Sequence, residues 1–201
     1  MRWGTFRNFR NQPETPATNA PLSESPPLSP ERPLEDLETT PIPDLIADPL
    51  QTDHVWLLRE VGRLVVLSET VENQFAAHEQ APTGLGTHLQ AMREGLARHI
   101  DSEEQVIYPA VLAGNAQEIR GAIRDLELEH VAMDKALARM RELTTDLTAP
   151  TDASEEWQEL YSALLAVENR IKRHARIEDE ILFPRVFFEQ PDSQEPGQGG
   201  S

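Results

Sequence analysis

Two segments of the chain repeat one pattern of residues that can bind metal ions. Each reads His-x3-Glu-x4-aromatic-Pro; the first extends from His99 to Pro109 and the second, 75 residues later, from His174 to Pro184. Because side chains four residues apart project from the same face of a helix, each segment places an imidazole and a carboxylate one turn apart. Those two ligand types suit iron, manganese or zinc better than copper(I) or a sulfur-demanding site. The repeat therefore predicts metal coordination.

A second histidine precedes each copy of the pattern by nearly the same interval. His54 lies 45 residues before His99, and His130 lies 44 residues before His174. A duplicated helical hairpin with one imidazole at a matched height on every helix predicts a binuclear metal centre. The other two histidines have no such counterpart, and we expect them to be ordinary surface or core residues.

The glutamates of the repeated pattern are expected to face the protein interior. Glu103 lies between Ile100 and Ile107 at helical spacing, and Glu178 is flanked in the same way by Ile181 and earlier isoleucines. A charged side chain on such an apolar stripe is costly unless it is paired or bound to a metal. Their positions therefore strengthen the prediction of a metal centre.

The elements that must position these residues are predicted to be four long helices. Apolar residues recur at helical spacing over about 48–78, 84–113, 115–147 and 152–188. Short connections between successive amphipathic helices are typical of an antiparallel, up-down-up-down four-helix bundle. We therefore expect an all-α domain over residues 48–190, built from two helical hairpins related by a pseudo-two-fold axis.

Both ends of the chain are expected to be disordered. Ten of the 16 prolines fall between Pro13 and Pro49, and the Pro-rich extension 1–47 has little apolar surface to bury. The tail 191–201 has a similar composition. Residues 1–12 differ, since they are basic and aromatic, and two interpretations stay open: an unstructured start, or a short peptide that docks on a protein partner.

The composition excludes several classes of function. A net charge of −17 argues against nucleic acid and against anionic membranes as partners, because both would require a basic face. The chain has no cysteine, which excludes disulfides, thiolate zinc sites, iron–sulfur ligation and cysteine nucleophiles. No apolar run approaches the roughly 20 residues that span a bilayer, and the N-terminus lacks a secretory signal, so we expect a cytoplasmic protein.

The ligand spacing and the two aromatic-proline endings resemble the hemerythrin-like family, the His-His-Glu cation-binding domain, over about residues 49–189. Ferritin-like di-iron bundles carry Glu-x-x-His instead, with the order reversed. The resemblance implies two non-haem iron ions joined by an oxo or hydroxo bridge, with manganese or zinc less expected. The metal ligands that it implies are His54, His99, Glu103, His130, Asp134, His174 and Glu178.

The resemblance also implies how the histidines are shared between the two irons. It assigns His54 and His99 to one ion, and His130 and His174 to the other. The family's third helix carries another histidine four residues after the first, and this chain has Asp134 there. We expect this carboxylate to replace the missing imidazole.

The bridging carboxylate of the last helix has two candidates. In oxygen-carrying members of the family it is an aspartate five residues after the histidine, the place of Asp179. Many relatives use a glutamate four residues after the histidine instead, the place of Glu178. The matched spacing of the first copy of the pattern favours Glu178.

This ligand set leaves one iron with an open coordination position, where oxygen, peroxide or another small ligand binds. We expect a non-haem di-iron protein that binds or responds to oxygen or reactive oxygen species, in sensing, storage or stress response. Two alternatives stay open. One is a di-iron enzyme that oxidises ferrous iron or removes peroxide, and the other is an interaction protein with a structural metal.

Overall fold

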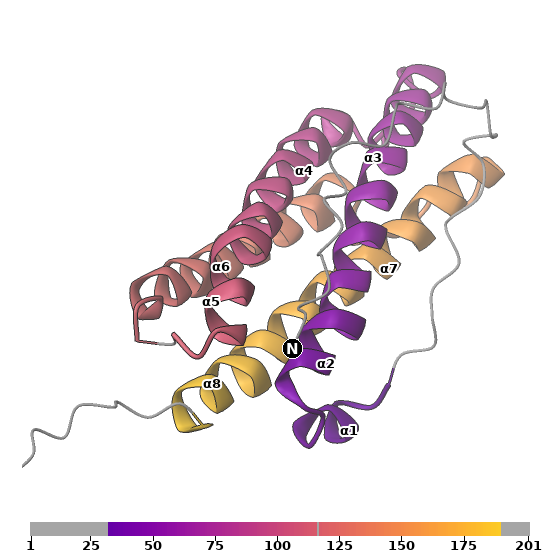
Figure 1. Cartoon of the computed structure of the whole chain (residues 1–201). Helices are drawn as coiled ribbons and strands as arrows, with labels where there is room; N and C mark the ends of the chain where they lie inside the picture. Colours follow the sequence, from indigo (N-terminus) through magenta and orange to yellow (C-terminus); the bar gives the residue numbers. More distant parts are fainter. Residues whose placement is uncertain (1–31, 116, 190–201) are drawn as a thin grey trace, which may run out of the picture.

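The computed structural model describes residues 32–115 and 117–189, whose regular structure is entirely helical. Four long helices form the body of the fold (Figure 1): α3 (Gln51–Gln74), α4 (Leu85–Ser102), α6 (Arg120–Leu143) and α7 (Glu155–Arg176). Helix α3 packs along both α4 and α7, and α4 also packs along α6. The all-α class predicted from the sequence is confirmed, while the antiparallel, up-down-up-down order stays a prediction.

The two copies of the repeated pattern fold into the same irregular local structure. Helix α4 continues through a wide π-helical turn, η3 (Glu103–Ile107), into α5 (Tyr108–Leu112). Helix α7 continues in the same way through η4 (Ile177–Leu182) into α8 (Phe183–Glu189). Each copy has its proline just after the wide turn, and a proline supplies no N–H for regular helical bonding to the preceding turn. The glutamate of each copy is the first or second residue of its π-helical segment.

The folded part begins earlier in the chain than the sequence predicted. Three short helical segments precede α3, namely α1 (Leu34–Glu38), α2 (Ile42–Leu45) and η2 (Ile46–Leu50). Leu37 and Leu45 are fully buried, so the expectation of disorder is wrong for residues 32–47. The prolines of this stretch stand at helix starts, where a missing N–H costs little, and they are therefore compatible with short helices. The predictions for 1–31 and 191–201 lie outside the described residues.

Polar residues separate two apolar clusters along the long helices. One cluster joins all four long helices, and includes Leu57, Leu64, Leu89, Ile100, Leu137, Leu164 and Ile171. The other joins the N-terminal segments to the end of the bundle, and includes Leu37, Leu50, Ile107, Leu126, Ile177 and Leu182. On each long helix or its continuation, the predicted metal-ligating residues stand between members of these clusters. The core therefore encloses the candidate site from both ends.

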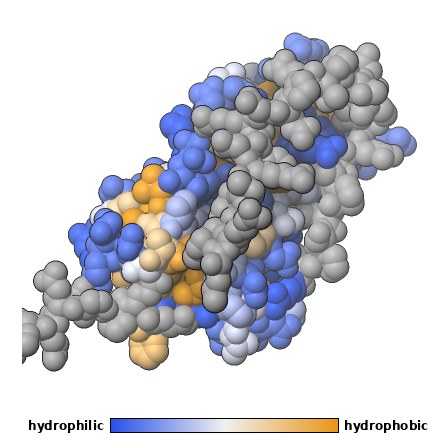
Figure 2. All heavy atoms as spheres, in the orientation of Figure 1, coloured by the Kyte–Doolittle hydropathy of each residue, from blue (hydrophilic) through white to orange (hydrophobic). Residues whose placement is uncertain are grey.

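The described surface is mostly hydrophilic on the face that Figure 2 shows, with a smaller apolar area. Val55 and Phe188 are among its largely exposed apolar side chains. Among the helices described, none combines the length and the apolar character needed to cross a membrane.

Candidate metal centre

Four histidines, one from each long helix, direct their Nε2 atoms toward a common region in the middle of the bundle. The Nε2 atoms of His54 and His174 are 3.4 Å apart, and those of His99 and His130 are 3.2 Å apart. All four side chains are buried. The imidazoles therefore form two pairs, one between α3 and α7 and one between α4 and α6.

Glu103 connects the two pairs. Its Oε2 lies 2.9 Å from Nε2 of His54, and its Oε1 lies 2.8 Å from Nε2 of His99. Its Oε1 also lies 3.9 Å from Nε2 of His174. A carboxylate whose two oxygens face both pairs has the arrangement of a bridge between two metal ions. The side chain has no exposed surface, as expected for a group enclosed by the bundle.

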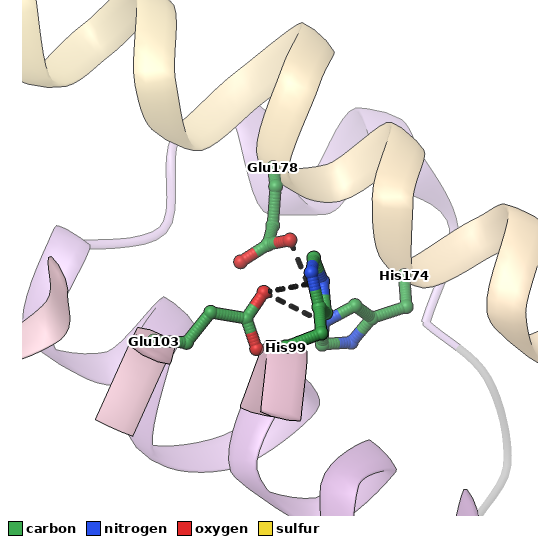
Figure 3. A group of neighbouring side chains, drawn as sticks. All are labelled: His99, Glu103, His174 and Glu178. Carbon is green, nitrogen blue, oxygen red and sulfur yellow. Dashed lines mark ion pairs between the residues drawn. The ribbon is translucent and has the colours of Figure 1, made fainter. Parts of the chain in front are cut away.

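Glu178 approaches both imidazole pairs from the side opposite Glu103, and Figure 3 shows it above Glu103. Its Oε2 lies 3.3 Å from Nε2 of His130 and 3.6 Å from Nε2 of His174. Its Oε1 instead accepts a hydrogen bond of 2.7 Å from the hydroxyl of Tyr108. The two glutamates thus both reach at least one imidazole of each pair, Glu103 through two oxygens and Glu178 through one.

The outer nitrogen of every histidine faces a further carboxylate. The Nδ1 atoms of His54, His99 and His130 lie within 3.1 Å of an oxygen of Glu104, Glu129 and Asp179 respectively. Nδ1 of His174 lies 3.6 Å from the buried Asp53, which also pairs with Arg170. Metal-bound histidines commonly donate their outer N–H to a carboxylate, which fixes the ring and leaves the inner nitrogen to bind the ion. The set of four such contacts is therefore typical of metal ligands.

The contacts inside the centre fit metal ions better than they fit hydrogen bonds. Both oxygens of Glu103 and Oε2 of Glu178 are buried without a hydrogen-bond partner, although imidazole nitrogens lie close to them. Ligands at about 2.1 Å from one ion and about 90° apart are about 3.0 Å from each other. The nitrogen–nitrogen and nitrogen–oxygen separations in the centre are close to that value. The imidazole and carboxylate donors suit iron, manganese or zinc.

Without metal, the centre holds protons that an ion must displace. Burial alone would lower the pKa of His130, but the neighbouring carboxylates of Asp179 and Glu178 raise it to about 9. Burial is likewise outweighed at His174, where the charge of Glu178 and other neighbouring carboxylates raise the pKa to about 10. Burial raises the pKa of Glu103, yet contacts with three imidazoles bring it well below its ordinary value. Metal uptake at such a site should release protons.

Six of the seven predicted ligands come together in the structure, and one does not. Asp134 lies on α6 one turn after His130, and its side chain is exposed. It lines a groove between α4, α6 and α7 rather than the cluster of imidazoles. Its role as a ligand stays a prediction.

The pairing of the histidines differs from the expected one. The resemblance implied His54 with His99 and His130 with His174, whereas the structure pairs His54 with His174 and His99 with His130. These contacts do not assign the imidazoles to ions, because His99 and His174 also form one group with Glu103 and Glu178 that could hold a metal. The expected division of the histidines between two irons stays a prediction.

The structure also distinguishes the two carboxylates of the last helix and adds residues that the sequence reasoning missed. Glu178 points into the centre, and Asp179 binds the outer nitrogen of His130. Asp53 and Tyr108 were not assigned to the site. The signal for Asp53 was its place beside His54 on a helix face that should be buried, and the signal for Tyr108 was its hydroxyl next to a predicted ligand.

A groove leads from the surface to one side of the centre. Helices α6 and α7 contact each other much less than the other neighbouring long helices do, and a cavity of about 590 Å³ lies between them and α4. Its walls are formed largely by small or apolar side chains, among them Ala91, Gly95, Leu96, Ala132, Met133 and Ile171. His99, His130 and His174 reach it from the centre. Small molecules therefore have a path to these imidazoles.

Residues 45–186 match the Hemerythrin family, described as the hemerythrin HHE cation binding domain. The chain belongs to this family. The match covers all four long helices and both hairpins that carry the centre. As a hemerythrin-family protein, the chain carries a domain type that binds cations, and its buried histidines and glutamates include a group that can hold a metal ion.

Similar hemerythrin-family proteins come from Yersinia. The chain is 30% identical over 153 residues to the iron-sulfur cluster repair protein YtfE of Yersinia pseudotuberculosis serotype IB (strain PB1/+) and to that of Yersinia pestis (strain Pestoides F). Each alignment covers 76% of this chain and 69% of the relative.

Proposed function

We propose that this hemerythrin-family protein holds two non-haem iron ions and acts in the response to oxygen or reactive oxygen species, as a contributor to iron–sulfur cluster repair. The bridging position of Glu103 carries the proposal, because each of its oxygens lies within 3 Å of an imidazole from a different pair. The names of the relatives support the repair role. The long helices are proposed to run antiparallel, so that each hairpin contributes to both ions.

We take each imidazole pair as the place of one proposed metal ion. His54 and His174 would hold one ion, and His99 and His130 would hold the other. Glu103 and Glu178 would be shared between them, and Asp134 is retained as a candidate that could approach the second ion from the groove. Two iron ions with these ligands would supply electrons and an open coordination position for oxygen, peroxide or another small ligand.

The side chains of the chain have defined tasks around such a pair of ions. The outer carboxylates orient the imidazoles and keep their Nε2 atoms free of protons when metal is bound. The two buried glutamates offset the charge of the cations in a region from which bulk water is excluded. The groove lets a small ligand approach from the side of α6, and the apolar clusters close both ends of the site.

A second candidate function is a di-iron enzyme that oxidises ferrous iron or removes peroxide. The open groove favours this candidate over a purely structural metal, because structural sites are typically closed by protein ligands. Turnover of ferrous iron or peroxide in air, measured on the metal-loaded protein, separates an enzyme from a protein that only binds or senses its ligand.

Metal analysis combined with an absorption spectrum tests the proposal. Two irons per chain and charge-transfer bands that disappear on reduction are the expected result. One zinc per chain, or no bound iron, would refute it. Asp134→Asn provides a control for the ligand set: loss of one iron assigns this residue to the centre, whereas two retained irons limit the ligands to the other six residues.

A further inference from the structure

The two copies of the metal-binding pattern differ at their aromatic residue. Tyr108 ends the first copy, and Phe183 holds the matching place in the second. The Tyr108 side chain is 2% exposed, and its hydroxyl donates the hydrogen bond of 2.7 Å to Oε1 of Glu178. Its ring also stacks on His54, with centroids 5.9 Å apart and planes 7° from parallel. Tyr108 thus contacts two residues of the centre from opposite hairpins.

The hydrogen bond makes the two shared glutamates unequal. Both oxygens of Glu103 face imidazole nitrogens and lack a hydrogen-bond donor. In Glu178 the tyrosine hydroxyl engages Oε1, so Oε2 alone faces both His130 and His174. A phenylalanine in the place of Tyr108 would leave the two glutamates alike in this respect.

We propose that Tyr108 is a positioning residue that holds Oε1 of Glu178 on its hydroxyl, so that Oε2 alone would be offered to the two metal positions, whereas Glu103 would offer both oxygens. The inference rests on the proposed function, since it requires two metal ions. The terminal torsion of a glutamate is broad and roughly two-fold, so the carboxylate needs an external contact to fix its orientation. Tyr108 supplies that contact by donating to one oxygen.

The stacking on His54 makes Tyr108→Phe a clean substitution. The phenyl ring preserves the aromatic contact and the apolar packing, and the variant lacks only the hydroxyl. Without this donor, the Glu178 carboxylate would turn and offer both of its oxygens to the metal positions. Partners of ligating carboxylates typically affect metal affinity by about 10- to 100-fold, and we expect a change in that range for at least one ion.

Near-infrared magnetic circular dichroism of the full chain, loaded anaerobically with ferrous iron, tests the inference. The spectrum reports the coordination number of each ion and the exchange coupling between them. We expect Tyr108→Phe to retain two irons while changing the coupling and the coordination number of one ion. Tyr161→Phe is the matched control, because Tyr161 is also a buried tyrosine but belongs to the apolar cluster of the four long helices.

The outcomes separate the inference from the proposed function. If the wild-type chain binds one iron or none, both fail. If it binds two and Tyr108→Phe has the spectrum and iron affinity of the wild type, the inference about Tyr108 fails and the proposed function stands. A melting temperature lowered equally in Tyr108→Phe and Tyr161→Phe, with unchanged spectra in both, would also overturn it, because it would assign Tyr108 a role in packing alone.

Discussion

The metal-free protein should lose stability as the pH rises from 6 to 9.5. The pKa of His130 is raised from 6.5 to about 9 in the folded protein by Asp179 and Glu178, against the effect of burial. A group with a raised pKa in the folded state stabilises that state fully below its unfolded pKa, and this contribution disappears as the pH rises through the folded value. The stabilisation from His130 should therefore be complete near pH 6 and almost absent at pH 9.5.

The size of this loss follows from the shift. A difference of 2.5 pKa units at about 1.36 kcal/mol per unit corresponds to about 3.4 kcal/mol, of which about 3 kcal/mol should disappear between pH 6 and 9.5. For a domain of this size that corresponds to a fall of roughly 6–12 °C in melting temperature. His174, whose pKa is raised to about 10, adds to the loss in the same direction. The chain has no cysteine thiol that would titrate in this range.

Denaturant unfolding of the chelator-treated protein at several pH values measures the effect. His130→Asn should flatten the dependence by about 3 kcal/mol, since it removes the titrating imidazole. The iron-loaded protein should show the opposite trend from pH 6 upward, because protons compete with the metal for the imidazoles. A metal-free protein whose unfolding free energy is constant or increases from pH 6 to 9.5 would refute the reasoning.

Three further predictions concern the groove, the N-terminal segments and the outer carboxylates. Gly95→Met should narrow the groove and slow azide binding to the iron-loaded protein by at least about 10-fold, because Gly95 lines the groove and a Cβ there meets only the end of Arg98. Stopped-flow absorption measures the binding rate, and Gly121→Met is the control at an open position outside the groove. Equal binding rates in the two variants would contradict the proposed path. Leu45→Ala should lower the free energy of unfolding by about 2–5 kcal/mol, because it removes a fully buried side chain from the second apolar cluster. Urea unfolding measures this loss. A loss below about 0.5 kcal/mol, which is typical of a surface substitution, would show that this segment does not belong to the core. Asp179→Asn should weaken binding of one iron by about 10- to 100-fold and leave the affinity for the other unchanged, because it alters the partner of one imidazole. A competitive chelator titration measures both affinities. Equal weakening of both would count against two separate imidazole pairs.

The sequence predicted the centre well where the two halves of the chain repeat. Because the repeat fixes both the interval and the helix face, His99 with Glu103 and His174 with Glu178 could be placed before the fold was known. The pairing of the imidazoles could not, since it depends on which helices lie side by side. Nothing in the local pattern distinguishes the contact of α3 with α7 from that with α4.

The N-terminal boundary was missed for a different physical reason. A high proline content usually indicates a segment that cannot bury enough surface to fold. Here the prolines occupy the first positions of short helices, and the leucines between them cover one end of the bundle. The contribution of Leu37 and Leu45 is tertiary, and composition alone does not reveal it.

Anomalous diffraction at the iron edge from crystals of the iron-loaded protein tests the central claim most directly. The account predicts two iron peaks per chain, about 3.5–4 Å apart, as in two-metal sites generally. One peak should lie beside His54 and His174 and the other beside His99 and His130, with Glu103 between them. A single peak, or two peaks divided between other pairs of histidines, would contradict it.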